Sequence, residues 1–411
     1  MSHSRRDFIT GLTALTAAGM QLPSFAADSA IASGAGEGTD DFASYPGVYL
    51  DSASHHPLTR AAAGAIRDYV AGLETGHSAS VSAEVRGKFA KLINADTDEI
   101  SYAPSTSMGE NLVTMALGIP ARGGRIITDA LHFIGSFYLY EQLGKQGMDI
   151  IVLPMQEDGS VSMRQYADAL TDDTVLLAVS HVSWVNGFQH DLGALSELAH
   201  SVGARLYADI IQSAGNTPID VKAMGIDFAC CATYKWLMGD FGLAFLYADK
   251  QLVNELETPW YGYLQTRNFV TPDTHLYPFD PPGEPPYTSS RTGGVGGLFN
   301  GAFPPRMIEA GANASLDLLL TTGVEAIQAH RQPMIDALQR TLTARGFRPY
   351  TPEGTTSPIV SFIHENAQRL DEQLAATGVK ISTYNDRFRI SPSFFNTMND
   401  IDKVIEVLGY A

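Results

Sequence analysis

From residue 100 to about residue 250, short apolar runs alternate with segments of helical periodicity. The strand-like runs are 125–128, 150–153, 175–179, 204–208, 226–232 and 243–247, and helical segments between them include 136–146, 162–170 and 192–202. Strands that alternate with helices are typical of a mostly parallel sheet wrapped by helices. We therefore expect an α/β fold whose large domain is built on such a sheet.

The pattern changes near residue 320, where a long helix is expected over 323–345. A strand at 358–363, a helix at 367–376, a strand at 388–390 and a last helix over 401–408 follow, which together predict a small C-terminal α+β domain. The segment 259–297 is rich in Pro, Gly and Tyr, and we expect it to form loops over the functional pocket.

The first 26 residues have the features of a twin-arginine signal peptide. Arg5 and Arg6 precede a short apolar segment, and the small residues Ser24 and Ala26, in Ser24-Phe25-Ala26, offer a cleavage site. We expect export of the folded protein to the periplasm through the twin-arginine (Tat) translocase. Residues 27–44 read as a flexible acidic linker, residues 45–318 as the large domain with an N-terminal segment that joins the small one, and residues 319–411 as the small domain.

The charge and composition of the chain limit the classes of partner that it can bind. The net charge of −18 argues against nucleic acid and against anionic membranes, and no apolar stretch is long enough to anchor the chain in a bilayer. Cys230 and Cys231 are the only cysteines, and neighbours on one strand point to opposite faces. We therefore expect two buried free thiols, with no disulfide and no metal site.

An acid and a lysine close two neighbouring apolar runs of the predicted sheet. Asp209 follows the run 204–208, and Lys235 follows the run 226–232. Because ligands bind at the carboxyl ends of parallel strands, both side chains are expected to face one ligand. A lysine amine and a buried carboxylate are what pyridoxal phosphate needs, the first for a Schiff base and the second against the pyridine nitrogen.

With these residues in place, the chain resembles the class V aminotransferase family of fold type I pyridoxal phosphate enzymes, which includes cysteine desulfurases, kynureninases and isopenicillin N epimerase-like proteins. The similarity is most specific at 181–183, 187, 190–192, 208–209 and 234–235, where it is nearest to kynureninases and the epimerase-like group, in particular to exported members. The resemblance implies a seven-stranded large-domain sheet, pyridoxal 5′-phosphate as cofactor, and a homodimer with its site at the subunit interface.

The resemblance also implies roles around the cofactor ring. Lys235 would form the Schiff base and later move the proton at the substrate α-carbon, on the way to and from a quinonoid. Asp209 would keep the ring nitrogen protonated, and Gln212 would bond the ring hydroxyl. The aromatic side chain stacked on the ring would be His132 or Phe133; alignment on the preceding Thr-Asp favours His132.

The phosphate of the cofactor would be bound at the start of a predicted helix. Thr106 and Ser107 lie there, where backbone amides and hydroxyls favour an anion. Tyr234 matches a tyrosine with which kynureninases hold the phosphate. Thr292, or backbone amides near Gly294, would add the contact that a partner subunit usually supplies.

The substrate side is implied by a second group of residues. Arg389 matches the family arginine that clamps the substrate carboxylate. His55 and His56 stand where relatives carry other residues, and Trp184 replaces an asparagine of the desulfurase motif, which indicates a bulky site that Trp260 would also line.

The resemblance leaves the reaction open. We expect a periplasmic enzyme that transaminates, or otherwise converts at the α-carbon, an amino acid or the amino-acid terminus of a larger metabolite. The alternatives are a lyase that cuts a Cβ–Cγ or C–S bond, as kynureninase does, and a non-catalytic binding protein that keeps the fold. No cysteine follows Ala232, so the mobile-loop thiolate of a cysteine desulfurase is missing.

Overall fold

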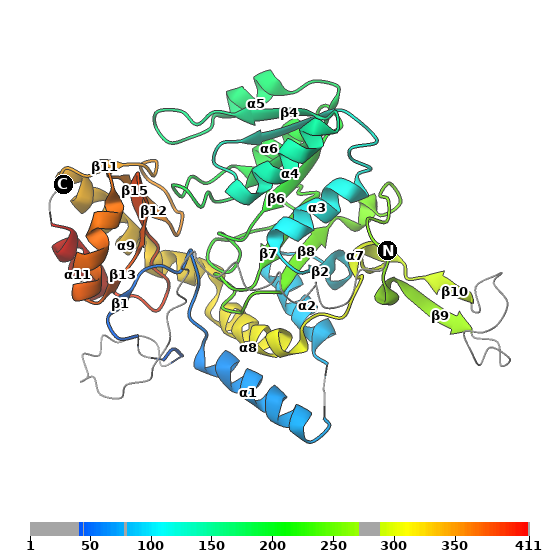
Figure 1. The fold of residues 1–411 in the computed structure, drawn as a ribbon, viewed down its shortest axis with the longest axis horizontal. Helices are drawn as coiled ribbons and strands as arrows, with labels where there is room; N and C mark the ends of the chain where they lie inside the picture. Colours follow the sequence, from blue (N-terminus) through cyan, green and yellow to red (C-terminus); the bar gives the residue numbers. More distant parts are fainter. Residues whose placement is uncertain (1–40, 44, 78–79, 271–287, 410–411) are drawn as a thin grey trace, which may run out of the picture. The chain divides into compact units, whose positions relative to one another are not determined.

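The computed structural model describes residues 41–43, 45–77, 80–270 and 288–409 (Figure 1). They belong to one compact unit, which runs from Gly36 to Ala411. The predicted signal peptide and most of the predicted linker lie outside the described residues. Within the described ranges, no helix combines the length and apolar character needed to cross a membrane.

A seven-stranded sheet forms the larger part of the fold, with strand order β2-β8-β7-β6-β5-β3-β4. The strands are β2 (Ile100–Ala103), β3 (Arg125–Asp129), β4 (Asp149–Leu153), β5 (Thr174–Ser180), β6 (Arg205–Asp209), β7 (Phe228–Ala232) and β8 (Ala244–Ala248). Only β8 runs against its neighbours, so the expectation of a mostly parallel, seven-stranded sheet is confirmed. Because β8 is antiparallel to both β2 and β7, those two strands end at the same edge of the sheet.

The central strands are continuous apolar runs because they are covered on both faces. Every residue of β7 and β8 is buried, and so are Leu206 to Asp209 of β6. The helices that accompany the sheet are α2 (Ser82–Leu92), α3 (Thr106–Ala116), α4 (Ile134–Lys145), α5 (Met163–Ala169), α6 (Leu192–His200), α7 (Gly294–Phe299) and α8 (Arg306–Thr322).

Helix α3 packs closely on β7 through a glycine. Ser105 caps the helix by accepting the backbone N–H of Met108, and Gly109 in the second turn faces Cys230. A Cβ at position 109 would lie 2.4 Å from the Cys230 sulfur. This glycine is therefore required by the close approach of the helix to the strand.

The C-terminal part has its own sheet and its own hydrophobic core. The four strands β11 (Arg348–Pro349), β12 (Val360–Ile363), β15 (Arg387–Ile390) and β14 (Ser382–Thr383) are antiparallel in that order. The helices of this part are α9 (Val324–Ala344), α10 (Asp371–Ala376) and α11 (Met398–Leu408); Figure 1 shows α9 and α11 beside β11, β12 and β15.

The N-terminal segment of the described chain joins this smaller core. Strand β1 (Val48–Tyr49) pairs in parallel with β13 (Val379–Lys380), and Leu50 is fully buried in the core. The chain then runs into α1 (Arg60–Glu74), which packs on α8. The exact domain boundaries stay a prediction.

One expected loop region contains regular structure. Strand β9 (Thr266–Val270) pairs with β10 (Thr288–Arg291) as an antiparallel hairpin, and α7 begins within the same expected loop. Residues 271–287 lie outside the described part. The expectation of loops throughout 259–297 is thus wrong for these elements, because two short strands can pair through their backbones without the apolar alternation that marks a strand in the sequence.

Candidate functional site

Asp209 and Lys235 lie at the same edge of the large sheet. Asp209 is the last residue of β6, Lys235 follows the end of β7 by three residues, and both strands are parallel. Both side chains are buried, with residue exposures of 3% and 7%. The sequence-based expectation that one edge of the sheet brings these two groups together agrees with their positions.

Lys235 is a buried amine without an anionic partner in contact. Among the described residues, no hydrogen bond or ion pair engages its Nζ, whose nearest recorded aromatic neighbour is the Tyr234 ring at 5.7 Å. Burial, followed by the positive charge of Arg389, lowers its pKa to about 8. A lysine held in this way is an available nucleophile near neutral pH.

Asp209 is a buried carboxylate whose burial raises its pKa to about 6, against the opposing effects of His132, the Ile211 amide and Lys235. Its Oδ1 accepts the backbone N–H of Ile211 at 3.0 Å. Because burial destabilises the ionised form of this acid, a cation that binds beside it stabilises that form. The protonated nitrogen of a pyridine ring is such a cation.

The start of α3 lies at the same edge of the sheet. Thr106 begins the helix, and its Oγ1 accepts the backbone N–H of Ala232 at 3.1 Å, which ties the helix start to the end of β7. Ser107 is half-buried in the same first turn. The helix start is thus bonded to a residue three positions before Lys235, and the N-terminus of a helix favours an anion such as a phosphate.

Aromatic rings flank the lysine on the side of Tyr234. The Tyr234 ring stacks on Phe241 with centroids 4.1 Å apart, and His55 stacks on Phe241 at 5.5 Å. Phe241 is 59% exposed in this single chain. The three rings form an accessible wall beside the lysine, and Phe241 is a member that the sequence did not point to.

Gln212 is fixed between two elements. Its Nε2 donates to the carbonyl oxygen of Ala53 at 3.0 Å, and its Oε1 accepts from the Trp236 indole at 2.9 Å. One amide hydrogen is left for another acceptor. A ring hydroxyl or its oxyanion is an acceptor of the right kind.

Arg389 connects the small core to the site. Its Nη1 donates to the carbonyl oxygen of Trp184 at 2.9 Å, and its Nη2 donates to Ser54 Oγ at 2.6 Å and Ser382 Oγ at 3.1 Å. Asp51 is 3.6 Å away. The Nε is buried and, among the described atoms, has no hydrogen-bond partner, so one face of the guanidinium has a donor left for a carboxylate.

The structure distinguishes His132 from Phe133, the two candidates for the ring-stacking residue. Its charge acts on Asp209, and its imidazole is fully buried. The Phe133 ring instead meets Trp184 edge-on, with centroids 6.2 Å apart, and the Trp184 indole donates to the carbonyl oxygen of His132 at 3.3 Å. This arrangement favours His132 as the ring-stacking residue; the role itself stays a prediction.

The structure adds a buried polar network that sequence reasoning missed. Glu110 on α3 accepts from His132 Nε2 at 3.0 Å, from Ser136 Oγ at 2.5 Å and from the Tyr140 hydroxyl. All four side chains are buried. A sequence signal existed, since positions 106, 109, 110 and 113 share one face of an α-helix, and the other three residues on that face are small or apolar.

A second buried acid lies next to this network. Asp129, at the end of β3, accepts from the Tyr166 hydroxyl at 2.8 Å and lies 3.3 Å from His190 Nε2. His190 Nδ1 contacts the carbonyl oxygen of Ser180 at 2.8 Å. These contacts hold Asp129 in place, three residues before His132.

His56 is a correction to the predicted substrate site. Its Nδ1 lies 2.8 Å from the carbonyl oxygen of Pro57 and its Nε2 lies 2.8 Å from Ser393 Oγ, and the ring is fully buried against aromatic side chains. Burial lowers its pKa to about 4. With both ring nitrogens occupied, His56 is a structural residue, whereas its neighbour His55 faces the Tyr234 side.

Three other predicted residues are not brought together with Lys235 by this single chain. Trp260 donates to the carbonyl oxygen of Phe299 and packs over Gly301. Thr292 is bonded to the Gln265 and Leu264 carbonyl oxygens, and Gly294 is exposed. Thr292 or Gly294 is predicted to reach the site of a partner subunit, and a structure of one chain does not test this prediction.

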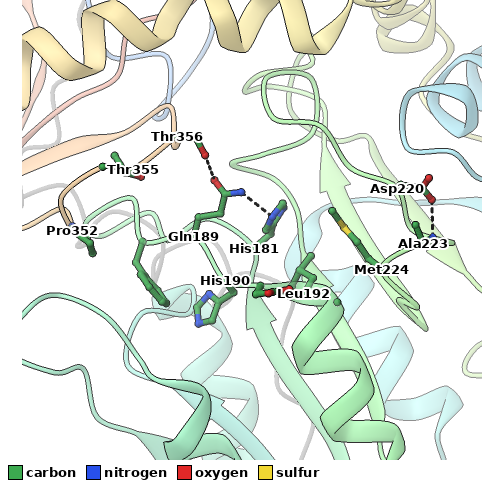
Figure 2. Close-up of a pocket in the computed structure, with 14 residues that line it drawn as sticks. His181, Gln189, His190, Leu192, Asp220, Ala223, Met224, Pro352, Thr355 and Thr356 are labelled. Atoms are coloured by element: carbon green, nitrogen blue, oxygen red, sulfur yellow. Dashed lines mark hydrogen bonds between the residues drawn. The ribbon is translucent and has the colours of Figure 1, made fainter.

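A separate cavity of about 590 Å³ lies between the loop after β5 and the loop 352–356 (Figure 2). In it, Gln189 lies 3.5 Å from His181 Nε2 and accepts from Thr356 Oγ1 at 3.3 Å. Burial lowers the pKa of His181 to about 3, so this ring is neutral. Neither Lys235 nor Asp209 lines this cavity.

The chemical groups around Lys235 fit pyridoxal 5′-phosphate. An amine without an anionic partner, a carboxylate with a raised pKa, and a helix start tied to β7 match the aldehyde, the ring nitrogen and the phosphate of that group. The described residues contain no group of three or more His, Cys, Asp or Glu side chains placed to bind a metal ion.

Comparison with known sequences identifies the family. The sequence profile of the class V aminotransferases matches residues 48–404. An uncharacterized aminotransferase, YcbU, of Bacillus subtilis (strain 168) is 27% identical over 370 residues, which cover 88% of this chain and 93% of that protein. A probable cysteine desulfurase of Methanothermobacter thermautotrophicus is 29% identical over 342 residues, covering 79% and 81%.

Solved structures show the same fold. The apo cysteine desulfurase of Thermococcus onnurineus NA1 gives a TM-score of 0.75 at 19% identity, covering 88% of this chain and 94% of that one. The cystine C–S lyase C-DES, solved with its product cysteine persulfide, gives 0.76 at 18% identity, covering 89% and 98%.

These relatives correct one expectation. The nearest likeness was expected among kynureninases and epimerase-like proteins, but the relatives named above are an uncharacterized aminotransferase, two cysteine desulfurases and a C–S lyase. The wider expectation of the family, the fold and the cofactor is confirmed. The chain belongs to the class V aminotransferase family of pyridoxal phosphate-dependent enzymes.

Proposed function

We propose that this protein is a carbon–sulfur lyase that acts on a cysteine-type amino acid and releases the sulfur with a small product rather than onto an enzyme thiol. Support comes from relatives named as cysteine desulfurases and from a structural neighbour named as a cystine C–S lyase. This reading develops the lyase alternative above and replaces transamination as the first candidate.

The observation that carries the proposal is the position of the two cysteines. Cys230 and Cys231 are both on β7 with at most 1% exposure, and burial raises the pKa of both thiols. Sulfur transfer to an enzyme requires a thiolate that can reach the substrate. The chain has no other cysteine, so the sulfur must leave with a diffusible product.

Bound pyridoxal phosphate supplies an electron sink for the electron pair released at the substrate α-carbon. Lys235 would remove the α-proton, a role supported by its buried amine, whose pKa is lowered to about 8. The electron pair of the broken Cβ–S bond leaves with the sulfur. After uptake of water, the carbon skeleton is released as pyruvate and ammonium.

Arg389 and its neighbours orient the substrate for that step. The free Nε of Arg389 would bind the substrate carboxylate, while Ser54 and Ser382 hold the guanidinium in place. Trp184 presents its carbonyl oxygen to the same arginine and its ring to Tyr384, at a centroid distance of 6.2 Å. The side chain beyond the α-carbon would therefore meet an aromatic surface.

The test is a product assay on purified protein loaded with pyridoxal phosphate. Cystine, cysteine and S-alkylcysteines are supplied in turn, and pyruvate, alanine, ammonium and sulfur products are measured. Pyruvate and ammonium in equal amounts, with a persulfide or thiol, are the expected result. Alanine as the carbon product would contradict the proposal.

Two variants make the assay specific. Lys235→Ala should remove activity while the fold is kept, and Cys230→Ala combined with Cys231→Ala should leave the pyruvate yield unchanged. A loss of turnover in the folded double cysteine variant would show that a thiol takes part, which would overturn the proposal.

Transamination is the second candidate, favoured by the relative named as an aminotransferase. Conversion of the cofactor to pyridoxamine phosphate during a single turnover, without pyruvate release from a cysteine-type substrate, would select it. A folded protein that binds no cofactor would select the binding-protein alternative.

We further infer a homodimer, because Phe241 and Gly294 are exposed in the single chain and because family members form their sites between two subunits. Light scattering of the purified protein tests this directly. A monomer with full lyase activity would contradict it.

A further inference from the structure

Glu110 is a buried acid near the site that is bonded by three side chains. Its two oxygens accept from His132 Nε2, Ser136 Oγ and the Tyr140 hydroxyl, and its exposure is 2%. Three donors directed at one carboxyl group favour the ionised form. Although burial opposes the charge, His132 and these hydrogen bonds lower the pKa of Glu110.

A buried carboxylate is stabilised by a counter-charge, because an unpaired ion in the protein interior loses its hydration without compensation. Ser136 and Tyr140 are neutral, so of the groups bonded to Glu110 only the imidazole of His132 can carry positive charge. The second ring nitrogen of His132 lies 2.9 Å from Ser180 Oγ, whose oxygen can accept a hydrogen bond from a protonated Nδ1.

The other charged groups that face His132 favour the same state. Asp209 on β6 and Asp129 at the end of β3 both act on the ring as negative charges. Although burial opposes protonation, Glu110 and then these two acids raise the pKa of His132. Tyr140 packs on the ring, with centroids 6.2 Å apart.

We propose that Glu110 is a positioning residue which holds the imidazole of His132 in one orientation and in its doubly protonated form, so that a fixed positive charge lies beside the acid that binds the cofactor ring. This inference rests on the cofactor site described above and does not depend on which bond the enzyme cleaves.

The charge of His132 would act on the cofactor through Asp209, the acid assigned to the pyridine nitrogen. Burial raises the pKa of Asp209, and the charge of His132 is the first influence that lowers it again. A protonated His132 therefore keeps Asp209 ionised and ready for a pyridinium nitrogen. Glu110 touches neither Asp209 nor Lys235 through any recorded hydrogen bond among the described residues, so it acts through His132.

Nitrogen-15 NMR of the histidine rings in the loaded enzyme tests the proposal. The His132 signals are assigned by their loss in His132→Gln. In the native protein, both ring nitrogens of His132 should still show the shifts of protonated nitrogen above about pH 6.5, where a free histidine ring loses its proton. In Glu110→Gln, the pKa of His132 should fall by about one to three units, the effect of removing one opposite charge at contact distance.

His200 is the internal control, since it pairs with Asp227 at 2.7 Å in another part of the fold and its ring signals should be the same in both proteins. Glu110→Asp keeps the charge and should restore part of the shift. If Glu110→Gln does not fold, the native spectrum still decides. A non-protonated His132 nitrogen at pH 6, or an unchanged titration in Glu110→Gln, would overturn the proposal.

The cofactor gives an independent readout. Loss of the His132 charge in Glu110→Gln should raise the pKa of Asp209 and weaken pyridoxal phosphate binding more at pH 6 than at pH 8. A merely structural role for Glu110 would weaken binding equally at both pH values. Failure of the C–S lyase proposal would leave all these results unaffected.

Discussion

The guanidinium of Arg389 and the backbone carbonyl of Trp184 are joined by a 2.9 Å hydrogen bond, which links strand β15 of the small core to the loop after β5 of the large sheet. The position of the arginine is therefore set by both parts of the chain. Its free Nε is aligned by contacts that no single segment supplies.

Arg389→Lys should reduce kcat/KM for cystine by about 10- to 100-fold, mainly through KM. Lysine has neither the planar guanidinium nor its Nε donor, and a hydrogen bond to a charged group contributes about 1.5–3 kcal/mol. Steady-state kinetics measure the effect. Arg387→Lys, two residues earlier on the same strand and stacked on Tyr384, should have a much smaller effect; equal losses in both variants would refute the assignment.

Asp209→Asn should stabilise the apoprotein in a pH-dependent way. The folded-state pKa of about 6 lies above the ordinary 3.8, so the folded form binds more protons between these values, and this carboxyl makes stability fall as pH rises from about 4 to about 6. About two units at 1.36 kcal/mol each give a gain on the order of 3 kcal/mol above about pH 6. The same variant should lose affinity for pyridoxal phosphate.

Urea unfolding of the cofactor-free protein at several pH values measures this difference. Below about pH 4 both proteins should be equally stable, because Asp209 is protonated in the folded and unfolded states. Asp168→Asn, at a side chain that is 70% exposed, is the control. A difference that does not vary with pH would contradict the explanation.

Two adjacent histidines should respond differently to replacement. His56→Ala should cost on the order of 2–4 kcal/mol of unfolding free energy, since it empties a buried site and leaves Ser393 Oγ without its ring partner. His55→Ala, at a partly exposed ring beside Phe241, should change stability by less than about 1 kcal/mol and act on kcat/KM instead. Thermal unfolding and kinetics on both variants distinguish these outcomes.

Export is expected to depend on Arg5 and Arg6. Cell fractionation should find the native protein in the periplasm, shortened by cleavage after Ala26, and the protein with lysine at both positions in the cytoplasm at full length. Arg122→Lys, in the folded part of the chain, should be exported normally. Native protein that stays in the cytoplasm with its first 26 residues intact would refute the prediction.

The large sheet was predictable because strands covered on both faces must be apolar throughout. The runs ending in Asp209 and before Lys235 show this directly, since all of β7 and nearly all of β6 is buried. The β9–β10 hairpin was not predictable in the same way. Its residues, such as Thr266 and Arg291, form a ladder through backbone groups, which every sequence possesses.

The site was predictable where a residue type is tied to one chemical task. A lysine after a buried strand and an arginine in the last strand of the small core are of this kind. Glu110 was missed because a single acid in a helix usually faces water, and only the tertiary structure reveals that His132, Ser136 and Tyr140 converge on it. His56 was misassigned because adjacent residues in the sequence can face opposite directions.

Because α3 and β7 are in close contact, the residues tolerated at positions 109 and 230 depend on each other. Any side chain at position 109 would collide with the sulfur of Cys230, at 2.4 Å for the first carbon alone. Gly109→Ala should be tolerated only together with a smaller residue at position 230, so the two sites are expected to vary in concert among homologues. A cysteine that takes no part in the chemistry would then be retained for its size alone.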